Sequence, residues 1–316
     1  MAITPRTKWR NSMTTYAIIG TGVVGERIIH QISQHGTSSI TAIYDENTAR
    51  LQQMAQKYNV PAVSSLEELF ATKPDWVYIG TPPVSHGPLA KLAAQQGFNI
   101  LCEKPLAHDA VDGQQMVEDT EAVQTAMHFP MMYSPIVHRL KQAVDTKELG
   151  EIVRIELHTH FPVWPRPWQQ NPWIASREQG GFIREIFPHY FQLTHHIFGD
   201  ISIEAHQTVY PEDVTLCETA VTALAKTATG IPFVANAAAG IAQQERIDYK
   251  VYGTKKSMLI RNWGELWEMT SQEGEKQITV EQTVDSLLDA CEVRQGLVTF
   301  EEGAKIQTWI DQLLQA

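Results

Sequence analysis

A glycine-rich turn is the feature that most constrains the fold of this 316-residue chain. The apolar run at residues 16–20 predicts a short buried strand, and residues 26–32 predict a helix. Between them, residues 20–25 read Gly-Thr-Gly-Val-Val-Gly. The isolated glycine pattern often occurs by chance. The order of strand, glycine turn and helix, however, is typical of a dinucleotide-binding unit.

Each glycine of the turn has a separate task. Gly20 permits a tight turn, Gly22 lets a pyrophosphate approach the backbone, and Gly25 lets the helix pack closely. The first N–H groups of the helix, near Val23 and Val24, are free to bind phosphate. The sequence therefore predicts a nucleotide site at this turn.

An acidic residue follows the next predicted strand, residues 40–44. Asp45 stands where a carboxylate accepts both hydroxyls of an adenosine ribose and repels a 2′-phosphate. The alternative is an ordinary strand-end turn residue or a helix N-cap before residues 46–50. With the glycine turn in place, we predict that the cofactor is NAD and that NADP is disfavoured.

Strands and helices continue to alternate as far as residue 129. Strands are predicted at residues 76–79, 98–102 and 124–129, and helices at 49–58, 64–71, 86–96 and 110–123. This alternation implies a parallel sheet with right-handed crossovers, and such a sheet binds ligands along its carboxyl edge. The predicted cofactor contacts there, besides the glycine turn and Asp45, are Thr81, Pro82, His86, Glu103 and Lys104.

Lys104 stands just past one of these strands and is followed by Pro105. Proline disfavours helical geometry in the residue before it, so we expect Lys104 to be held extended at the carboxyl edge. A surface lysine with a fortuitous proline after it is the alternative, and this segment alone leaves the two about even.

Composition limits the class of protein. A net charge of −11 argues against nucleic acid or an anionic membrane as partner, and no apolar run approaches the roughly twenty residues of a membrane span. The cysteines Cys102, Cys217 and Cys291 lie far apart and in no metal spacing. We therefore expect a cytoplasmic protein with reduced thiols and no metal. Residues 1–13 are read as a flexible N-terminal extension, because they lack the apolar core of a secretory signal.

From residue 130 the pattern changes to strands with few helices between them. Residues 151–160 alternate polar and apolar side chains, and helices are predicted at 135–145 and 300–314. Further strands are predicted at residues 203–210, 218–226, 232–239, 247–252 and 257–261. The predicted fold is α/β: a Rossmann doubly wound parallel sheet over residues 14–129, and an α+β domain with a large open, mostly antiparallel sheet over 130–316. Because the outer face of such a sheet needs a cover, we predict a homodimer or homotetramer that forms through it.

Three tryptophans, Trp164, Trp168 and Trp173, occupy a proline-stiffened loop after the first of these strands. Their ring faces pack well against the C–H faces of sugars, so we predict substrate contacts. The equally weighted alternative is that they fasten the loop to the core or to a sister subunit.

A helix is predicted from residue 182, with Pro188 bending or starting it. Glu185 and His189 are four residues apart and share a face of this helix. Together with Arg184 they are predicted to contact substrate. A histidine beside a carboxylate acts as a general base, although a packed histidine paired with Glu185 is the more common arrangement.

Four motifs in this order resemble the glucose-fructose oxidoreductase/inositol dehydrogenase/rhizopine-catabolism (Gfo/Idh/MocA) family of nicotinamide-dependent oxidoreductases. They lie at residues 20–25, 81–86, 102–107 and 180–189. The resemblance implies an NAD-binding Rossmann domain and a second domain on a large open sheet, with substrate and nicotinamide meeting between them. It also implies that Lys104 touches the nicotinamide ribose and the substrate hydroxyl, and that His189 is the acid/base.

The chain departs from the family pattern around this histidine. Glu185 replaces an aspartate, Phe187 replaces a common glycine, and Gln192 stands where a second aspartate is frequent. Pro130 and Met132 stand where many members have asparagine and arginine. These changes leave the identity of the substrate open.

We therefore predict an NAD-dependent enzyme that transfers a hydride between nicotinamide and a secondary alcohol or ketone of a sugar, cyclitol or similar polyol. His189 is the predicted base, Lys104 stabilises the developing alkoxide, and Glu185 fixes or tunes His189. Three alternatives are weighed against it: a glycosidase that retains NAD and uses transient redox, a reductase of an imine or conjugated system, and a non-catalytic NAD-binding sensor.

Overall fold

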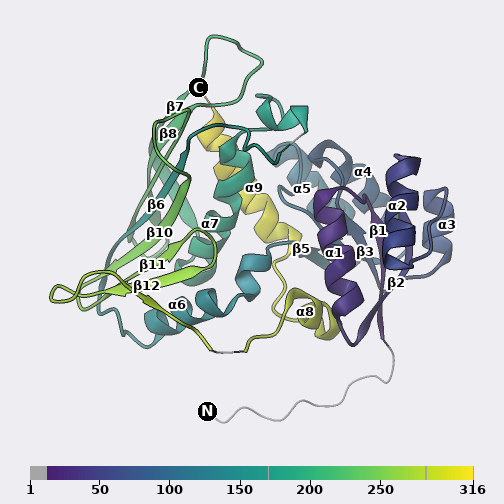
Figure 1. Cartoon of the computed structure of the whole chain (residues 1–316), viewed down its shortest axis with the longest axis horizontal. Coiled ribbons are helices and arrows are strands. Elements are labelled where there is room, and N and C mark those ends of the chain that lie inside the picture. The colour runs from purple at the N-terminus through teal and green to yellow at the C-terminus, as the bar shows by residue number, and fades with distance from the viewer. Residues whose placement is uncertain (1–12, 170, 282, 316) are drawn as a thin grey trace. The chain divides into compact units, whose positions relative to one another are not determined.

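The computed structural model describes residues 13–169, 171–281 and 283–315 (Figure 1). Apart from Met13, the predicted N-terminal extension lies outside these residues. The chain forms two compact units. The first unit comprises Met1–Glu103, Glu118–Met127 and Leu288–Leu297, and the second comprises Lys104–Val117, His128–Leu287 and Val298–Ala316. The chain therefore passes between the units several times, whereas a single boundary after residue 129 was predicted.

The first unit is built on a parallel five-stranded sheet with the order β2-β1-β3-β4-β5. The strands are β1 (Thr14–Ile19), β2 (Ser38–Tyr44), β3 (Trp76–Ile79), β4 (Asn99–Cys102) and β5 (Thr125–Met127). The predicted parallel sheet is thus confirmed. The strand order reverses between β1 and β3, and ligands of such sheets bind outside the carboxyl ends of the strands at this point.

Two of the helices between these strands begin with a side-chain cap. Ser65 accepts a hydrogen bond from the backbone N–H of Glu68 at 3.2 Å and starts α3, and Asn47 starts α2 in the same way. The helices between these strands are α1 (Val23–Gln34), α2 (Thr48–Tyr58), α3 (Leu66–Ala71), the 3₁₀ turn η1 (Pro83–Ser85), α4 (His86–Gln95) and α5 (Ala110–Asp119), most of which belongs to the second unit. One more helix, α8 (Leu287–Val293), comes from the later segment Leu288–Leu297 of the first unit, apart from its first residue. α8 was not predicted from the sequence.

The second unit contains an eight-stranded sheet with the order β13-β12-β11-β10-β6-β9-β8-β7. Its strands are β6 (Ile152–Phe161), β7 (Ile201–Val209), β8 (Ala220–Thr227), β9 (Pro232–Ala239), β10 (Arg246–Gly253), β11 (Ser257–Arg261), β12 (Glu265–Met269) and β13 (Lys276–Ile278). All neighbours are antiparallel except β6 and β9, which are parallel. The predicted mostly antiparallel sheet is confirmed, although β12 and β13 were missed.

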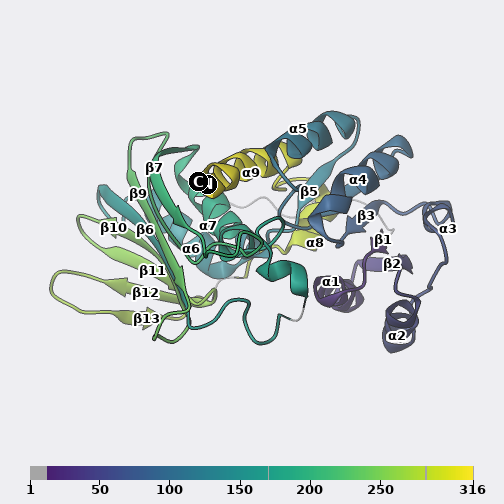
Figure 2. The ribbon, with the colours of Figure 1, turned by 90° about the horizontal axis from the view of Figure 1, so that it is seen from above.

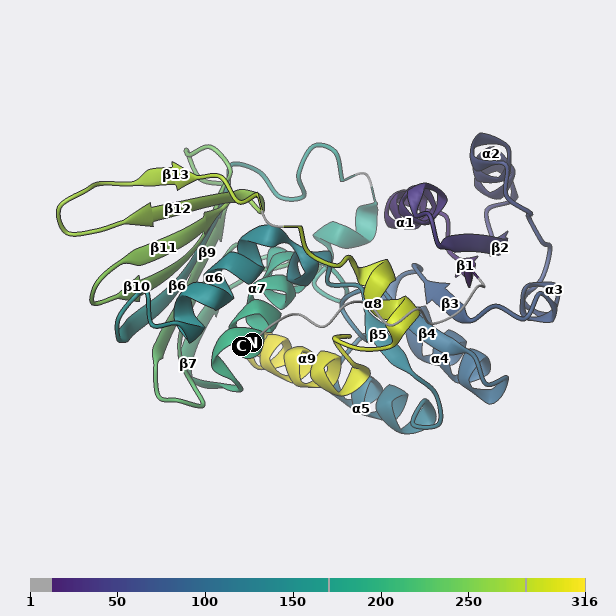
Figure 3. The same ribbon diagram turned by 90° about the horizontal axis from the view of Figure 1, so that it is seen from below.

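Three helices, α6 (Pro135–Asp145), α7 (Phe182–Phe198) and α9 (Phe300–Leu314), lie on one face of this sheet (Figures 2 and 3). Short 3₁₀ turns, η2 (Pro130–Tyr133) and η3 (Pro172–Ala175), precede α6 and α7. α7 runs through Pro188, so this proline does not start the helix. The φ angle of proline suits a helix, and the one lost N–H bond is tolerated inside the core.

Two features, a membrane-spanning helix and a metal-binding cluster, are absent from the described residues. No helix there is long and apolar enough to cross a membrane. Within the same residues, no group of three or more histidine, cysteine, aspartate or glutamate side chains is placed to hold a metal ion. The three cysteines are free and buried.

Candidate functional site

The glycine turn joins β1 to α1 in a conformation that needs its glycines. Gly20 has a φ of +92°, and a Cβ there would lie 2.7 Å from the backbone oxygen of Gly80. A Cβ at Gly25 would lie 2.1 Å from the backbone oxygen of Gly20, so α1 reaches the turn only because residue 25 has no side chain. A Cβ at Gly22 would meet nothing within 4 Å. The backbone of Gly22 is therefore open to close approach by a ligand.

The first turn of α1 offers its amide groups in the same place. Gly22 is the N-cap and supplies no side-chain acceptor, while Val23 is 56% exposed. The first N–H groups of a helix have no partner within the helix and favour an anion. These residues fit the pyrophosphate of a dinucleotide.

Asp45 follows β2 and turns its carboxylate toward the glycine turn. Oδ2 accepts hydrogen bonds from the backbone N–H of Thr21 at 2.6 Å and from its hydroxyl at 2.9 Å. Oδ1 accepts the N–H of Asn47 at 2.8 Å. The carboxylate therefore holds the turn in shape and stands beside the place where a ribose was predicted.

Arg50 is a residue that sequence reasoning missed. Its Nε donates to the backbone oxygen of Thr21 at 2.8 Å, and its Nη2 lies 2.6 Å from Glu26 Oε2. The pKa of Glu26 is lowered to about 2, first by the hydrogen bond from Lys57 and then by that from Arg50. A cation five residues after Asp45 thus borders the same turn, and it is already paired with an acid.

The loop after β3 lies beside the glycine turn. The N–H of Gly80 donates to the backbone oxygen of Ile19 at 2.8 Å. His86 is fully buried, and its Nε2 lies 2.8 Å from the backbone oxygen of Thr81, so it braces the loop. Pro82 is exposed on this loop. That these residues contact the cofactor stays a prediction.

Glu103 belongs to the framework of the first unit. It is 5% exposed, and its Oε1 accepts a hydrogen bond from the hydroxyl of Tyr78 at 2.7 Å. Burial and the neighbouring Glu103 charge raise the pKa of Tyr78 well above its usual range, which keeps the phenol as the donor. This contact joins the ends of β3 and β4.

Lys104 and Glu185 form an ion pair in the second unit. The Nζ of Lys104 lies 3.4 Å from Glu185 Oε1 and 3.3 Å from the backbone oxygen of Glu185. Their side chains are only 13% and 15% exposed, so the pair is largely shielded from solvent. The first turn of α7 therefore holds the lysine at two points.

His189 lies one turn further along α7. Its ring packs edge-to-face against Phe129, with ring centroids 5.6 Å apart, and against Trp263 at 5.2 Å. Trp263 belongs to the turn between β11 and β12 and has a φ of +71°. Sequence reasoning missed both aromatic residues. The signal for Trp263 was the Asn-Trp-Gly turn at residues 262–264.

The tryptophan loop divides into a packed and an exposed part. The indole N–H of Trp164 donates to the backbone oxygen of Ile174 at 3.3 Å, and its ring packs against Phe161 and Phe182. Trp164 thus fastens the loop to the core. This is the arrangement that the alternative interpretation of the tryptophans described. Trp168 is 54% exposed, with the Arg166 guanidinium 4.8 Å from its ring centroid, and Trp173 is partly exposed.

Arg184 braces the segment that precedes α7. Its Nη1 donates to the backbone oxygens of Arg177 and Gly180 at 3.0 and 3.2 Å. In the second unit the structure therefore brings Lys104 and Glu185 together and places His189 on the same helix. Substrate contacts by Arg184 and the tryptophans stay predictions.

Comparison with known proteins identifies two matching family models. The oxidoreductase family with an NAD-binding Rossmann fold (Gfo/Idh/MocA) matches residues 14–128, and the Gfo/Idh/MocA C-terminal domain matches residues 137–259. Together they cover more than half of the chain.

Two curated relatives are similar over part of the chain. The 2,7-anhydro-N-acetylneuraminate hydratase of Escherichia coli is 26% identical over 209 residues, covering 65% of this chain and 52% of the relative. The D-apiose dehydrogenase of Paraburkholderia graminis is 25% identical over 192 residues, covering 59% and 50%. The chain spans about half the length of the curated relatives it matches.

The fold also matches solved structures over nearly its whole length. A putative NADPH-dependent oxidoreductase from Desulfitobacterium hafniense superposes with a TM-score of 0.84, covering 96% of this chain and 95% of that one at 16% identity. An identity this low establishes a common fold and nothing further.

The close approach at Gly25 generates a test of the nucleotide site. We expect Gly25→Ala to weaken NADH binding at least about tenfold, because the added Cβ forces α1 away from the turn. Fluorescence titration with NADH measures the Kd, and circular dichroism checks the fold. Gly36→Ala is the matched control, since a Cβ at Gly36 would meet nothing within 4 Å. Equal Kd values for Gly25→Ala and wild type would remove the turn from the site.

Proposed function

Because the chain belongs to the Gfo/Idh/MocA oxidoreductase family, we propose that it transfers a hydride between a nicotinamide cofactor and a secondary alcohol or ketone of a sugar, cyclitol or similar polyol. The observation that carries this proposal is the shielded ion pair between Lys104 and Glu185, because Glu185 lies on the helix that also presents His189. The similarity to a D-apiose dehydrogenase supports the substrate class.

The chain's own residues then have separate roles. His189 takes the hydroxyl proton of the substrate, and the two aromatic rings beside it fix the plane of its imidazole. The ammonium of Lys104 stabilises the negative charge that develops on the substrate oxygen. Glu185 holds that ammonium in place. A bound nicotinamide supplies the hydride acceptor or donor.

A second candidate reaction is favoured by one relative. The Escherichia coli protein is named a hydratase, and net addition of water consumes no nicotinamide, so a nicotinamide that took part in such a reaction would be regenerated. In its lack of net cofactor consumption, such a reaction resembles the redox-assisted glycosidase that was weighed as an alternative. An assay that follows product with and without added cofactor separates the two reactions, because only a net oxidoreductase needs stoichiometric cofactor.

Variants of the proposed catalytic pair test the function directly. His189→Ala and Lys104→Ala should each lower kcat by about 10²- to 10⁴-fold, the usual cost of losing a positioned acid/base or charge stabiliser. The Kd for NADH, measured by fluorescence, should change less than about threefold in His189→Ala, whereas Lys104→Ala should also weaken NADH binding because Lys104 is a predicted cofactor contact. His138→Ala, at an exposed position on α6, serves as control. Full turnover by either catalytic variant would remove that residue from the mechanism.

We propose NAD as the preferred cofactor because of Asp45. Its carboxylate borders the glycine turn and repels a 2′-phosphate, whereas Arg50 is paired with Glu26. NADH should bind at least about tenfold more tightly than NADPH. Asp45→Asn should bring the Kd for NADPH closer to the Kd for NADH, because the carboxylate charge is removed. Titration of both proteins with both cofactors provides the measurement. Equal or tighter binding of NADPH by the wild type would refute the role of Asp45.

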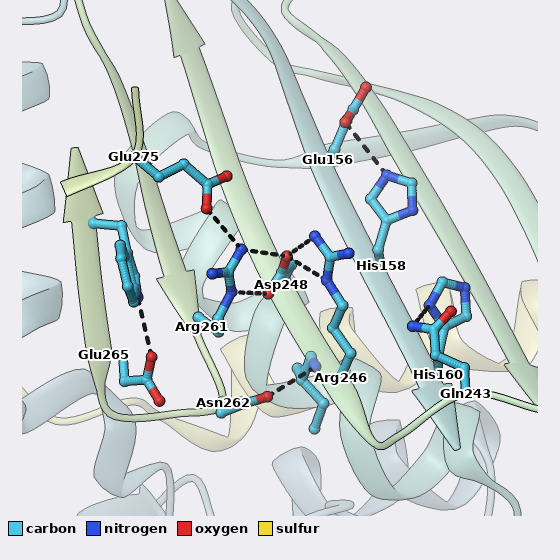
Figure 4. Close-up of polar contacts among 12 residues, drawn as sticks. Glu156, His158, His160, Gln243, Arg246, Asp248, Arg261, Asn262, Glu265 and Glu275 are labelled. Carbon is cyan, nitrogen blue, oxygen red and sulfur yellow. Dashed lines mark hydrogen bonds and ion pairs between the residues drawn. The ribbon is translucent and has the colours of Figure 1, made fainter. Parts of the chain in front are cut away.

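We also propose that the protein forms a homodimer or homotetramer through the open face of the eight-stranded sheet. Figure 4 shows that this face carries paired charges: Asp248 pairs with Arg246 and Arg261, and Arg261 also reaches Glu275 at 3.2 Å. Strand pairing sets Leu224 of β8 on the same face, and this leucine is 51% exposed. An exposed apolar side chain on a face whose charges at Asp248 are paired suits a protein interface.

Light scattering tests this assembly. On a size-exclusion column with light-scattering detection, the wild type should elute with the mass of a dimer or tetramer. Leu224→Lys should shift this mass toward that of the monomer, because burying an unpaired lysine charge in the interface raises the free energy of the assembly. Leu92→Lys, at a leucine of α4 that is 43% exposed, should leave the mass unchanged. A monomeric wild type, or a Leu224→Lys variant of unchanged mass, would contradict the proposal.

A further inference from the structure

Glu218 is a buried carboxylate at the N-terminus of α7. It is 2% exposed, and its Oε1 accepts a hydrogen bond from the backbone N–H of Ile183 at 2.7 Å. Gly181, the N-cap, has a φ of +97°, and a Cβ there would lie 2.2 Å from Glu218 Oε2. The start of the helix is therefore shaped around this carboxylate, and the glycine leaves room for it.

The second oxygen of the same carboxylate has no such bond. Oε2 is buried and has no hydrogen-bond partner among residues 13–169, 171–281 and 283–315. Burial raises the pKa of Glu218 to about 7, and the backbone N–H groups of Ile183 and of Glu218 itself, together with the nearby Arg184 charge, offset only part of that rise. Glu218 thus changes its charge close to neutral pH.

The acidic side chains next to Glu218 do not change their charge near neutral pH. Burial raises the pKa of Cys217 to about 12 and also raises that of Tyr210, so both stay neutral. Arg184 is bound to backbone oxygens, and Arg177 lies 3.7 Å from the ring centroid of Tyr210. An arginine guanidinium is always charged in proteins. Of the three acidic groups Glu218, Cys217 and Tyr210, only Glu218 titrates near neutral pH.

A short path of contacts leads from Glu218 through Glu185 to Lys104. Glu218 holds the N–H of Ile183, which is two residues before Glu185 in the same helical turn. The N–H of Glu185 donates to the backbone oxygen of Gly181 at 3.1 Å. The backbone and carboxylate oxygens of Glu185 in turn hold Lys104.

We propose that Glu218 is a positioning residue that holds the first turn of α7, and with it the Lys104–Glu185 pair, more firmly as a carboxylate than as a carboxylic acid. A hydrogen bond to an ionised acceptor is about twice as strong as one to a neutral acceptor, and negative charge is favoured at a helix N-terminus. The inference rests on the proposed function of Lys104 and His189. Ionisation of Glu218 then raises turnover as the pH passes through neutrality.

The same ionisation has the opposite effect on global stability. The pKa of Glu218 is higher in the folded chain than its usual value of 4.5, so the folded state binds more protons between these values. The stabilising contribution of Glu218 is therefore complete below about pH 4.5 and is lost as the pH rises to about 7. Stability and turnover should respond to Glu218 in opposite directions.

Glu218→Gln separates a positioning role from a merely structural one. The glutamine keeps an oxygen for the Ile183 N–H and removes the charge. At about pH 6 the variant and the wild type should have the same kcat within about twofold, because the wild type is then largely protonated. At about pH 8.5 the kcat of the variant should be about tenfold lower. Glu212→Gln makes the same chemical change at an exposed position nearby and should follow the wild type throughout.

A second measurement does not depend on turnover. The Tm of the wild type minus that of Glu218→Gln should fall between about pH 5 and pH 8, since only the wild type loses the stabilising contribution. Hydrogen exchange of the Ile183 amide in the wild type, corrected for intrinsic base catalysis, should slow over the same range. Because this exchange measurement uses only the wild type, it tests the proposal even if Glu218→Gln does not fold.

The outcomes distinguish the proposed hydride-transfer function from the proposed positioning role of Glu218. If no polyol is turned over but the Tm difference and the Ile183 exchange respond as expected, the proposed function fails while the charge-dependent hold of Glu218 on the helix stands. A kcat deficit of Glu218→Gln that is equal at every pH would overturn the positioning role. So would a variant that matches the wild type throughout, or an Ile183 amide whose protection is independent of pH.

Discussion

The burial of α7 against the eight-stranded sheet is the interaction on which the second unit depends. This helix is apolar on most of its surface, and such a helix is stable only when it is packed on several sides. Tyr190 packs on Tyr249 of β10, and Phe191 packs on Phe233 of β9. Because these contacts fix the rotation of α7, its partly exposed polar residues Glu185 and His189 have fixed positions as well.

In the first unit, the corresponding constraint is close backbone approach. Gly25 lets α1 pack directly on the turn, and Gly20 lets that turn pass the backbone of Gly80. Asp45 then ties the turn to the end of β2 through Thr21. The amide groups that suit a pyrophosphate are therefore presented by packing that only glycine permits. The second unit instead positions its candidate residues by side-chain packing and ion pairing.

Much of this could be predicted from the sequence because the signals are local. The helix at residues 135–145, the strand at 257–261 and the helix at 300–314 were predicted with the bounds that the structure has. Their apolar periodicity and flanking turn residues are sufficient. β13 has only three residues, and α8 has a short apolar pattern, so neither gives a clear periodic signal. Local patterns also cannot reveal that Leu288–Leu297 joins the first unit, since that depends on contacts far apart in the chain.

The candidate site was predictable to the extent that it follows motifs. Glu185 and His189 stood out by their spacing, and Lys104 by its place between a strand and Pro105. The packing of Trp263 and Phe129 against His189, however, depends on tertiary structure. The hydrogen bond from the Ile183 N–H to Glu218 joins residues 35 positions apart, so no local sequence pattern predicts it. Trp164 was weighed equally between substrate and core, and its packing on Phe161 and Phe182 accounts for it within the core.

The measurement that tests the account most directly is a panel of sugars, cyclitols and hydroxy acids mixed with NAD or NADP and followed at the NADH absorbance band. The account predicts that at least one polyol ring produces reduced cofactor in stoichiometric amount, with NAD preferred. Absence of reduced cofactor with every polyol, or conversion of substrate without net reduction of cofactor, would contradict it.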